Sequence, residues 1–306
     1  MTVAIHTRAL HKRYGSHTAL HGLDLTVQSG SVFGLIGPNG AGKTTTLRTL
    51  LDIIRPTSGD ITVLGASPRA GGAALRRRIW YVPGELRLEG RVKGRALLRH
   101  LAEISGPVAP GTIEQLAERL GLDLARPVRT LSKGNKQKLG LVQAFMHRPD
   151  LLVLDEPTSG LDPLVQREFL AMVREARDAG QTVLLSSHVL SEIQQAADDV
   201  AVLAQGRIVA EGPVSSLRIA SVRRVRATVT GVAAETVADA LAAASGIEDV
   251  DVAAAGDLVR VSATARGDID PVIRAIAAGT IRDLTVEEPD LEESVLDLYA
   301  RNGAAS

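Results

Sequence analysis

A glycine-rich stretch near residue 40 carries residue types that suit phosphate binding. Glycines let consecutive backbone N–H groups turn inward around phosphate oxygens, and a helix that starts after the stretch adds partial positive charge. We expect the Lys43 ammonium to reach the β- and γ-phosphates, the Thr44 hydroxyl to bind Mg²⁺, and Thr45 to donate to an α-phosphate oxygen. An ordinary strand-to-helix turn is the alternative. The residues that predict this P-loop for a nucleoside triphosphate are Gly37, Pro38, Asn39, Gly40, Ala41, Gly42, Lys43, Thr44 and Thr45.

Two acidic residues, Asp155 and Glu156, end the continuous apolar run 151–154. Such a run is typical of a strand buried on both faces of a parallel sheet, and open α/β sheets bind ligands at the carboxyl ends of their strands. We expect Asp155 to hold Mg²⁺, directly or through water, and Glu156 to polarise an attacking water. In the alternative interpretation the two acids cap the following helix.

A histidine and a tyrosine could complete a nucleotide site. His188 follows a second apolar run, residues 182–186, where it could contact the γ-phosphate or the attacking water, or be a structural residue. Tyr14 lies in the polar stretch 11–16, where its ring could stack on adenine or pack at the end of a strand.

Residues 131–135, Leu-Ser-Lys-Gly-Asn, open another helix with Ser132 as its N-cap. The exposed N–H groups of this helix could hold a second anion. Lys133, Lys136 and Lys138 could contribute positive charge there, and a solvated helix face explains them equally well.

These residues need a sheet and helices to bring them together. Residues 31–36 read as a strand, residues 45–54 as a helix, and residues 2–10 and 23–27 as half-buried strands. A helical pattern over 95–122 indicates a helical insertion at about 90–148. We therefore predict an α/β P-loop domain with an N-terminal β-subdomain over residues 1–213.

Residues 214–306 follow a different pattern, with strand, helix, strand, strand, helix and strand between 222 and 286. A small α+β ferredoxin-like domain is the simplest closure of that order, and its residues carry no metal or nucleophile cluster. Residues 291–298 predict an amphipathic helix, which could dock on its own chain.

Composition narrows the functional classes. The chain has 306 residues, enough for two domains, and no cysteine, which fits a reducing compartment. It has neither an apolar run of about 18 residues nor a signal-peptide core, so we expect a soluble, cytoplasmic polypeptide. The formal net charge is zero, which does not favour a nucleic-acid partner.

The ordered motifs together resemble the ATPase subunit of an ATP-binding cassette (ABC) transporter. They span about 200 residues and comprise the P-loop, residues 131–135, the apolar run that ends in Asp155 and Glu156, residues 159–162, and His188. Cassette subunits that export drugs or polyketides are similar to the whole layout, including the acidic stretch 287–293.

The resemblance implies a head-to-tail dimer that closes around two Mg-ATP. In that dimer Ser132, Gly134 and Asn135 face the ATP bound by the other copy's Lys43. Asp162 belongs to a loop that links the two sites, and Tyr14 stacks on adenine. The expected partners are an integral-membrane permease and a second nucleotide-binding subunit, which places the protein at the cytoplasmic face of the cell membrane.

Two positions depart from the family pattern. Lys133 and Asn135 stand where the family has glycine and glutamine. Gly84 stands where the family usually has a glutamine that meets Mg²⁺ and signals to the permease, so water or Glu85 must complete the metal shell.

The sequence thus predicts an ATP-hydrolysing subunit of an exporter of drugs or hydrophobic compounds. One alternative is a soluble cassette ATPase in translation or DNA metabolism. Another is a nucleotide-binding regulatory subunit with low turnover, which Gly84 and Lys133 make conceivable.

Overall fold

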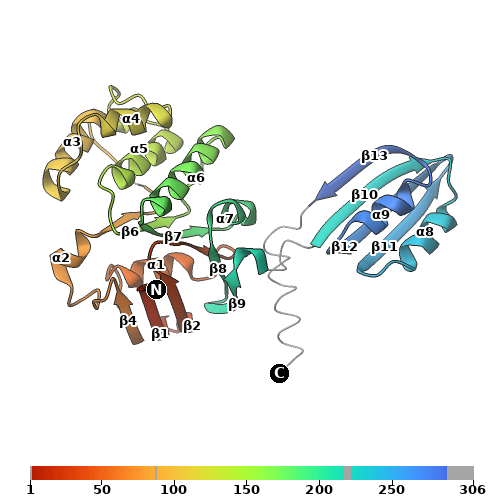
Figure 1. The fold of residues 1–306 in the computed structure, drawn as a ribbon, viewed down its shortest axis with the longest axis horizontal. Coiled ribbons are helices and arrows are strands. Elements are labelled where there is room, and N and C mark those ends of the chain that lie inside the picture. Colours follow the sequence, from red (N-terminus) through yellow and green to blue (C-terminus); the bar gives the residue numbers. More distant parts are fainter. Residues whose placement is uncertain (1, 87, 217–221, 288–306) are drawn as a thin grey trace. The chain divides into compact units, whose positions relative to one another are not determined.

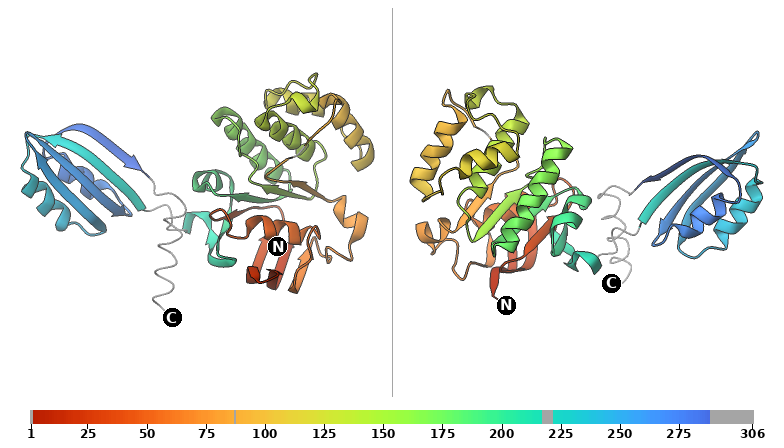
Figure 2. Two further views of the ribbon diagram at one scale, coloured as in Figure 1. Left: turned by 180° about the vertical axis from the view of Figure 1, so that it is seen from behind. Right: turned by 45° about the horizontal axis from the view of Figure 1, so that its top comes forward.

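The computed structural model describes residues 2–86, 88–216 and 222–287. The chain divides into two compact units, Met1–Ser215 and Ser216–Ser306, whose elements are drawn in Figures 1 and 2. The P-loop and both acidic residues belong to the first unit.

A six-stranded sheet forms the centre of the first unit in the described part of the chain. Its strands β3, β6 and β7 are buried along their whole length, which explains the continuous apolar runs in the sequence. Both β3 and β6 pair in parallel with β7, so the segments that follow these three strands meet at one edge of the sheet. The order is β5 (Ile79–Val82), β6 (Leu151–Asp155), β7 (Thr182–Ser187), β3 (Val32–Ile36), β8 (Asp199–Ala204) and β9 (Arg207–Pro213).

A second, antiparallel sheet carries the N-terminal strands β2 (His17–Gln28), β1 (Val3–Tyr14) and β4 (Ser58–Val63). It shares one hydrophobic core with β3, β6 and helix α1 (Lys43–Leu50). The hairpin between β1 and β2 pairs Tyr14 with His17. These strands run further than the half-buried strands expected from the sequence.

The expected helix over 45–54 is wrong at both ends. Helix α1 starts at Lys43 and ends at Leu50, and Asp52 adopts a left-handed conformation with φ of 56° that a helix cannot continue through. The charged side chains after Leu50 therefore lie in a loop.

Helices cover the central sheet and form the expected helical insertion (Figure 1). The insertion contains α3 (Gly94–Ser105), α4 (Thr112–Arg119) and α5 (Lys133–Phe145), with a 3₁₀ turn at Val128–Thr130. Arg119 ties α4 to α6 (Pro163–Asp178) through hydrogen bonds to Glu168 and Glu175. The remaining helical elements are α2 (Gly72–Arg76), α7 (Leu190–Ala196) and a 3₁₀ turn at Val214–Ser216.

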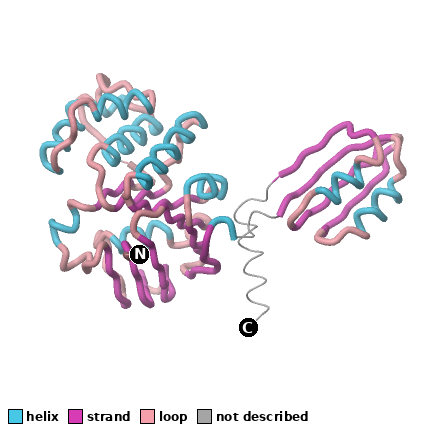
Figure 3. The backbone as a smooth tube through the Cα atoms, in the orientation of Figure 1, coloured by secondary structure: helices cyan, strands magenta, loops and turns pink. Residues whose placement is uncertain are grey.

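The second unit has the predicted strand and helix order and a ferredoxin-like topology. Its four described strands form one antiparallel sheet in the order β11, β12, β10, β13, with the two helices on one side (Figure 3). The expected helix at 291–298 lies outside the described residues. The elements are β10 (Val222–Thr230), α8 (Ala234–Ala242), β11 (Ile247–Ala255), β12 (Leu258–Arg266), α9 (Asp270–Ile276) and β13 (Thr280–Glu287).

Candidate nucleotide-binding site

Two glycines let the P-loop pass close to neighbouring strands. A Cβ atom on Gly37 would lie 2.1 Å from the carbonyl oxygen of Leu203 in β8, a distance that no side chain tolerates. Gly42 has φ of 108° and would place its Cβ 3.0 Å from the carbonyl oxygen of Ala19. The tight turn delivers Lys43 to the first position of α1, at the positive end of the helix.

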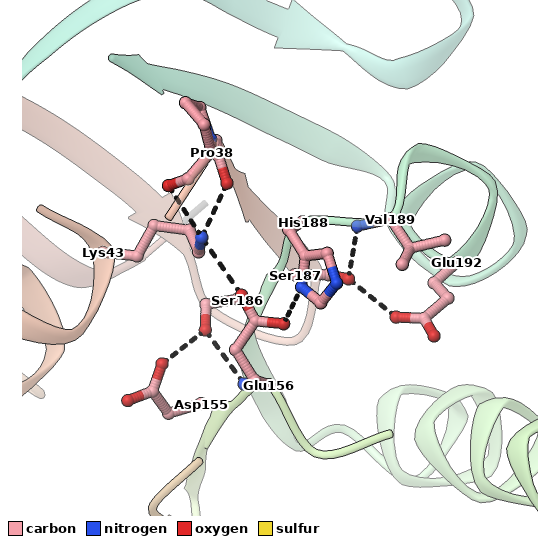
Figure 4. A network of polar contacts seen from close by, with 10 residues as sticks. Pro38, Lys43, Asp155, Glu156, Ser186, Ser187, His188, Val189 and Glu192 are labelled. Carbon is pink, nitrogen blue, oxygen red and sulfur yellow. Dashed lines mark hydrogen bonds and ion pairs between the residues drawn. The ribbon is translucent and has the colours of Figure 1, made fainter. Parts of the chain in front are cut away.

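The Lys43 side chain is turned back onto its own loop. Its Nζ donates to the carbonyl oxygens of Gly37 at 2.6 Å and Pro38 at 3.2 Å, and it forms an ion pair with Glu156 Oε1 at 3.0 Å (Figure 4). Lys43 is 6% exposed, so the pair is largely shielded from water.

Ser186 holds the two acidic residues at the end of β6. Its hydroxyl donates to Asp155 Oδ1 at 2.7 Å and accepts the backbone N–H of Glu156 at 3.1 Å. The backbone of Glu156 has φ of 48°, a strained conformation for a residue with a side chain. Neither acid caps the following helix, because Asp162 caps α6 by accepting from Val165 N at 3.1 Å.

His188 joins this network through Glu156. Its Nδ1 lies 2.5 Å from Glu156 Oε2, and its side chain is half exposed (Figure 4). The residues on either side of His188 are held by hydrogen bonds. Ser187 Oγ donates to the buried carboxylate of Glu192 at 2.7 Å and accepts a hydrogen bond from Val189 N. Glu156 therefore lies between Lys43 at the start of α1 and His188 in the segment after β7.

One cavity of about 320 Å³ brings most of the expected nucleotide contacts together. Tyr14 lies at its rim on the β1–β2 hairpin, and Lys12 Nζ lies 4.8 Å from the centroid of the Tyr14 ring. One face of the ring is therefore already covered by a cation. The lining residues are Tyr14, His17, Ala19, Pro38, Asn39, Gly40, Ala41, Gly42, Lys43, Thr44, Thr45 and Glu156.

The residues at the start of α5 do not line this cavity. Ser132 is the predicted N-cap, and its Oγ accepts from Asn135 N at 3.3 Å. A Cβ on Gly134 would lie 2.6 Å from the carbonyl oxygen of Gly160, so the helix start packs tightly against the loop before Asp162. Lys138 Nζ lies 3.8 Å from Asp162 Oδ2. Within one copy these residues form a cluster separate from the P-loop.

Sequence reasoning missed three contributors to the site. Ser186 bridges Asp155 and Glu156, and the only signal for it was a hydroxyl at the end of a buried apolar run. Tyr81 on β5 places its hydroxyl 3.5 Å from Asp155 Oδ2, and burial together with this carboxylate raises the pKa of Tyr81. His17 reaches the cavity only because the hairpin pairs it with Tyr14.

Gly84 approaches the end of β6 closely. A Cβ at this position would lie 3.1 Å from the carbonyl oxygen of Asp155 and 3.4 Å from Glu156 Cβ. A side chain at this position would therefore fit only if the backbone at Asp155 moved by a few tenths of an ångström. Glu85, the next residue, is exposed.

Two features are absent from the described residues. No group of three His, Cys, Asp or Glu side chains among them is arranged to hold a metal ion. No helix in the same part of the chain is long and apolar enough to cross a membrane.

Comparisons with known proteins identify the family of this chain. The family model described as "ABC transporter" matches residues 20–159. The chain is 37% identical over 221 residues to the bacitracin transport ATP-binding protein BcrA of Bacillus licheniformis, covering 71% of this chain and 72% of that protein. It is 38% identical over 222 residues to the daunorubicin/doxorubicin resistance ATP-binding protein DrrA of Streptomyces peucetius, covering 71% and 67%.

A third relative and a solved structure extend the match. The linearmycin resistance ATP-binding protein LnrL of Bacillus subtilis is 30% identical over 300 residues, covering 95% of this chain and 96% of that protein. A solved ATP-binding subunit of an ABC transporter superposes with a TM-score of 0.65 at 30% identity, covering 71% of this chain and 92% of that one. The chain therefore belongs to the ABC transporter family, as one of its ATP-binding, ATP-hydrolysing subunits.

Proposed function

We propose that this chain is the ATPase subunit of an exporter of drugs or other hydrophobic compounds. The observation that carries the proposal is the meeting of Lys43, Glu156 and His188 at one edge of the central sheet, beside a cavity lined by the P-loop. The proposed compound class rests on relatives whose names refer to bacitracin transport and to daunorubicin, doxorubicin and linearmycin resistance.

The P-loop is proposed to bind the triphosphate of ATP. Lys43 would exchange its contacts with the carbonyls of Gly37 and Pro38 for the β- and γ-phosphates, and Thr45 would donate to an α-phosphate oxygen. The uncovered face of the Tyr14 ring would stack on adenine.

Thr44 and Asp155 fit a Mg²⁺ site. Both supply the oxygen atoms that Mg²⁺ prefers, and a metal with so few protein ligands takes its other positions from phosphates and water. When bound, Mg²⁺ neutralises charge that develops on the phosphates. Ser186 keeps the Asp155 carboxylate in place by donating to its Oδ1 atom, and the Tyr81 hydroxyl lies 3.5 Å from its Oδ2 atom.

Glu156 is proposed to polarise the attacking water, with His188 as its partner. When Lys43 moves to the phosphates, Glu156 keeps its contact to His188 Nδ1, which orients the carboxylate. His188 is half exposed and can also contact the γ-phosphate. Glu156 and His188 would then act as one unit in hydrolysis.

A second copy is proposed to complete the site. Ser132, Gly134 and Asn135 lie outside the cavity of their own chain, which suits a role at the ATP held by the other copy. Asp162 lies close to α5, because its Oδ2 atom is 3.8 Å from Lys138 Nζ. From this position it could link the two sites. Closure around two Mg-ATP would drive a separate permease at the cytoplasmic face of the cell membrane, and no nucleic-acid partner is proposed.

Purification from membranes in mild detergent tests the assembly. The expected result is copurification of a polytopic membrane protein together with magnesium-dependent ATPase activity. An inactive protein, both as purified dimer and with its permease, would overturn the proposed catalytic role.

A further inference from the structure

The C-terminal sheet has one edge that is open to pairing. Strand β13 hydrogen-bonds to β10 on one side, from Arg224 opposite Glu287 to Thr230 opposite Thr280. No other described strand pairs with its second side, and Figure 1 shows β13 along the border of the sheet. An open strand edge presents a row of backbone N–H and C=O groups that can bind another strand.

The opposite edge of the same sheet is protected. Strand β11 carries Glu248, Asp249 and Asp251, and its pairing with β12 is interrupted between Glu248 and Asp251. Asp249 has φ of 51° in this irregular stretch. Like charges hinder pairing of an edge with its own copy. Strand β13 also has a register shift, where it pairs with β10, but it lacks such a run of like charges.

The face of β13 that points toward the helices is apolar and incompletely covered. Ile281, Leu284 and Val286 lie opposite buried core residues of β10, yet they remain 38%, 39% and 41% exposed. Helix α8 packs over β11, and α9 packs over β10 and β12, so the sheet is covered mainly away from β13. A neighbouring strand beyond β13 would shield these side chains.

The other face of β13 presents one positive and one negative side chain side by side. A shift in register between Thr228 and Val229 places Asp283 opposite Thr228 on the outer face. Arg282 turns to the same face, where its Nε donates to Thr230 Oγ1 at 3.3 Å. Within the described residues neither Arg282 nor Asp283 forms an ion pair of its own, since the ion pairs found there involve other side chains.

Of the antiparallel registers centred at or next to positions 282 and 283, one suits two copies of this strand. Pairing centred between positions 282 and 283 places Ile281 opposite Leu284 on the apolar face and Arg282 opposite Asp283 on the polar face, twice by symmetry. A shift that centres the pairing on Arg282 or on Asp283 opposes like charges. A register that places Asp283 opposite Leu284 is unsuitable, because Asp283 lies on the polar face of the strand and Leu284 on the apolar face.

We propose that two copies of this chain associate through β13, in antiparallel register with Arg282 of each copy opposite Asp283 of the other. The two C-terminal sheets then form one continuous sheet with an apolar seam of Ile281 and Leu284 on the helix side. This contact needs no nucleotide, so it goes beyond the ATP-dependent dimer of the proposed function. It would keep two ATPase units close to one another between cycles of closure.

The contact by itself is expected to be weak. One pair of eight-residue strands buries less than the roughly 800 Å² per partner of a standard protein interface. We therefore expect a dissociation constant in the micromolar range, measurable by sedimentation velocity over a range of protein concentrations.

Charge exchange at the two central positions provides the test. The full chain is examined without nucleotide and with EDTA, so that closure around Mg-ATP does not contribute. Arg282→Asp opposes Asp283 with a second aspartate at both symmetric positions, and Asp283→Arg does the same with arginine. Each change should weaken the dimer about tenfold, and the double exchange Arg282→Asp/Asp283→Arg should restore it. Arg260→Asp, the same charge change on the exposed side of the central strand β12, is the matched control.

Three results would overturn the proposal. The first is a wild-type chain that remains monomeric without nucleotide at hundreds of micromolar. The second is a dimer that Arg282→Asp and Arg260→Asp weaken equally. The third is a double exchange that stays as weak as the single variants although circular dichroism shows it folded. Each leaves the ATPase proposal standing, because that dimer requires Mg-ATP.

Discussion

The ammonium of Lys43 and the carboxylate of Glu156 form a largely buried ion pair, with Nζ and Oε1 3.0 Å apart. The two residues are distant in sequence, and they meet because β3 and β6 both pair with β7. Glu156 contacts His188 with its other oxygen, at 2.5 Å. One carboxylate thus connects the P-loop to the segment after β7.

Replacing Glu156 by glutamine should remove hydrolysis and retain ATP binding. The amide keeps the size of the side chain but cannot take a proton from water, so we expect ATP turnover to fall by about 100-fold or more. The variant should accumulate as a closed dimer with Mg-ATP, measured by size-exclusion chromatography. Turnover at the wild-type rate, or a monomer at saturating Mg-ATP, would contradict the assignment.

Replacing Lys43 by alanine should weaken nucleotide binding. Loss of a charge-assisted contact to phosphate should lower the affinity for Mg-ATP by about tenfold or more, measured by isothermal titration calorimetry. Lys93→Ala, at an exposed helix start away from the cavity, is the control and should bind as wild type does. Equal affinity of the two variants would exclude the proposed role of Lys43.

Tyr14 should contribute through its ring and not its hydroxyl. Because Lys12 covers one face, stacking uses the other face, and Tyr14→Phe should bind ATP nearly as well as wild type. Tyr14→Ala should lose about tenfold in affinity. Fluorescence titration with a labelled ATP analogue checks both variants, and a larger loss in Tyr14→Phe than in Tyr14→Ala would speak against stacking.

Ser186 should matter for the metal as well as for stability. Ser186→Ala leaves Asp155 Oδ1 without its buried donor, which should cost about 1–3 kcal/mol in free energy of unfolding and raise the Mg²⁺ concentration needed for half-maximal activity. Ser187→Ala removes a comparable bond to buried Glu192, so it should destabilise the fold without changing the Mg²⁺ requirement. Identical Mg²⁺ curves for both variants would show that Ser186 is purely structural.

His147 should make the fold sensitive to acid. Burial lowers the pKa of His147, whose ring stacks on Trp80 with centroids 4.6 Å apart. The folded pKa lies below the unfolded value of about 6.5, so the unfolded chain binds more protons and stability falls as the pH drops through 6.5. His147→Phe keeps an aromatic ring and removes the titration. Urea unfolding at pH 8 and pH 5 should therefore show a larger loss for wild type than for His147→Phe.

Local sequence determined the parts of the site that depend on short-range pattern. The glycines and Lys43 predict the P-loop because a tight turn before a helix needs those residue types, and the structure has that turn. The apolar run before Asp155 predicts a fully buried strand, which is β6. Ser132 was predicted as an N-cap from its side chain alone, and it caps α5.

Tertiary structure decided which of these parts touch. The order and register of β3, β6 and β7 place Ser186 between Asp155 and Glu156, and no local pattern specifies the neighbour of a strand. The cluster around Ser132 lies outside the P-loop cavity, although the sequence assigns both to nucleotide binding. Contacts between residues distant along the chain depend on how sheets and helices pack, so the sequence supplies the chemical groups and the packed fold supplies their partners.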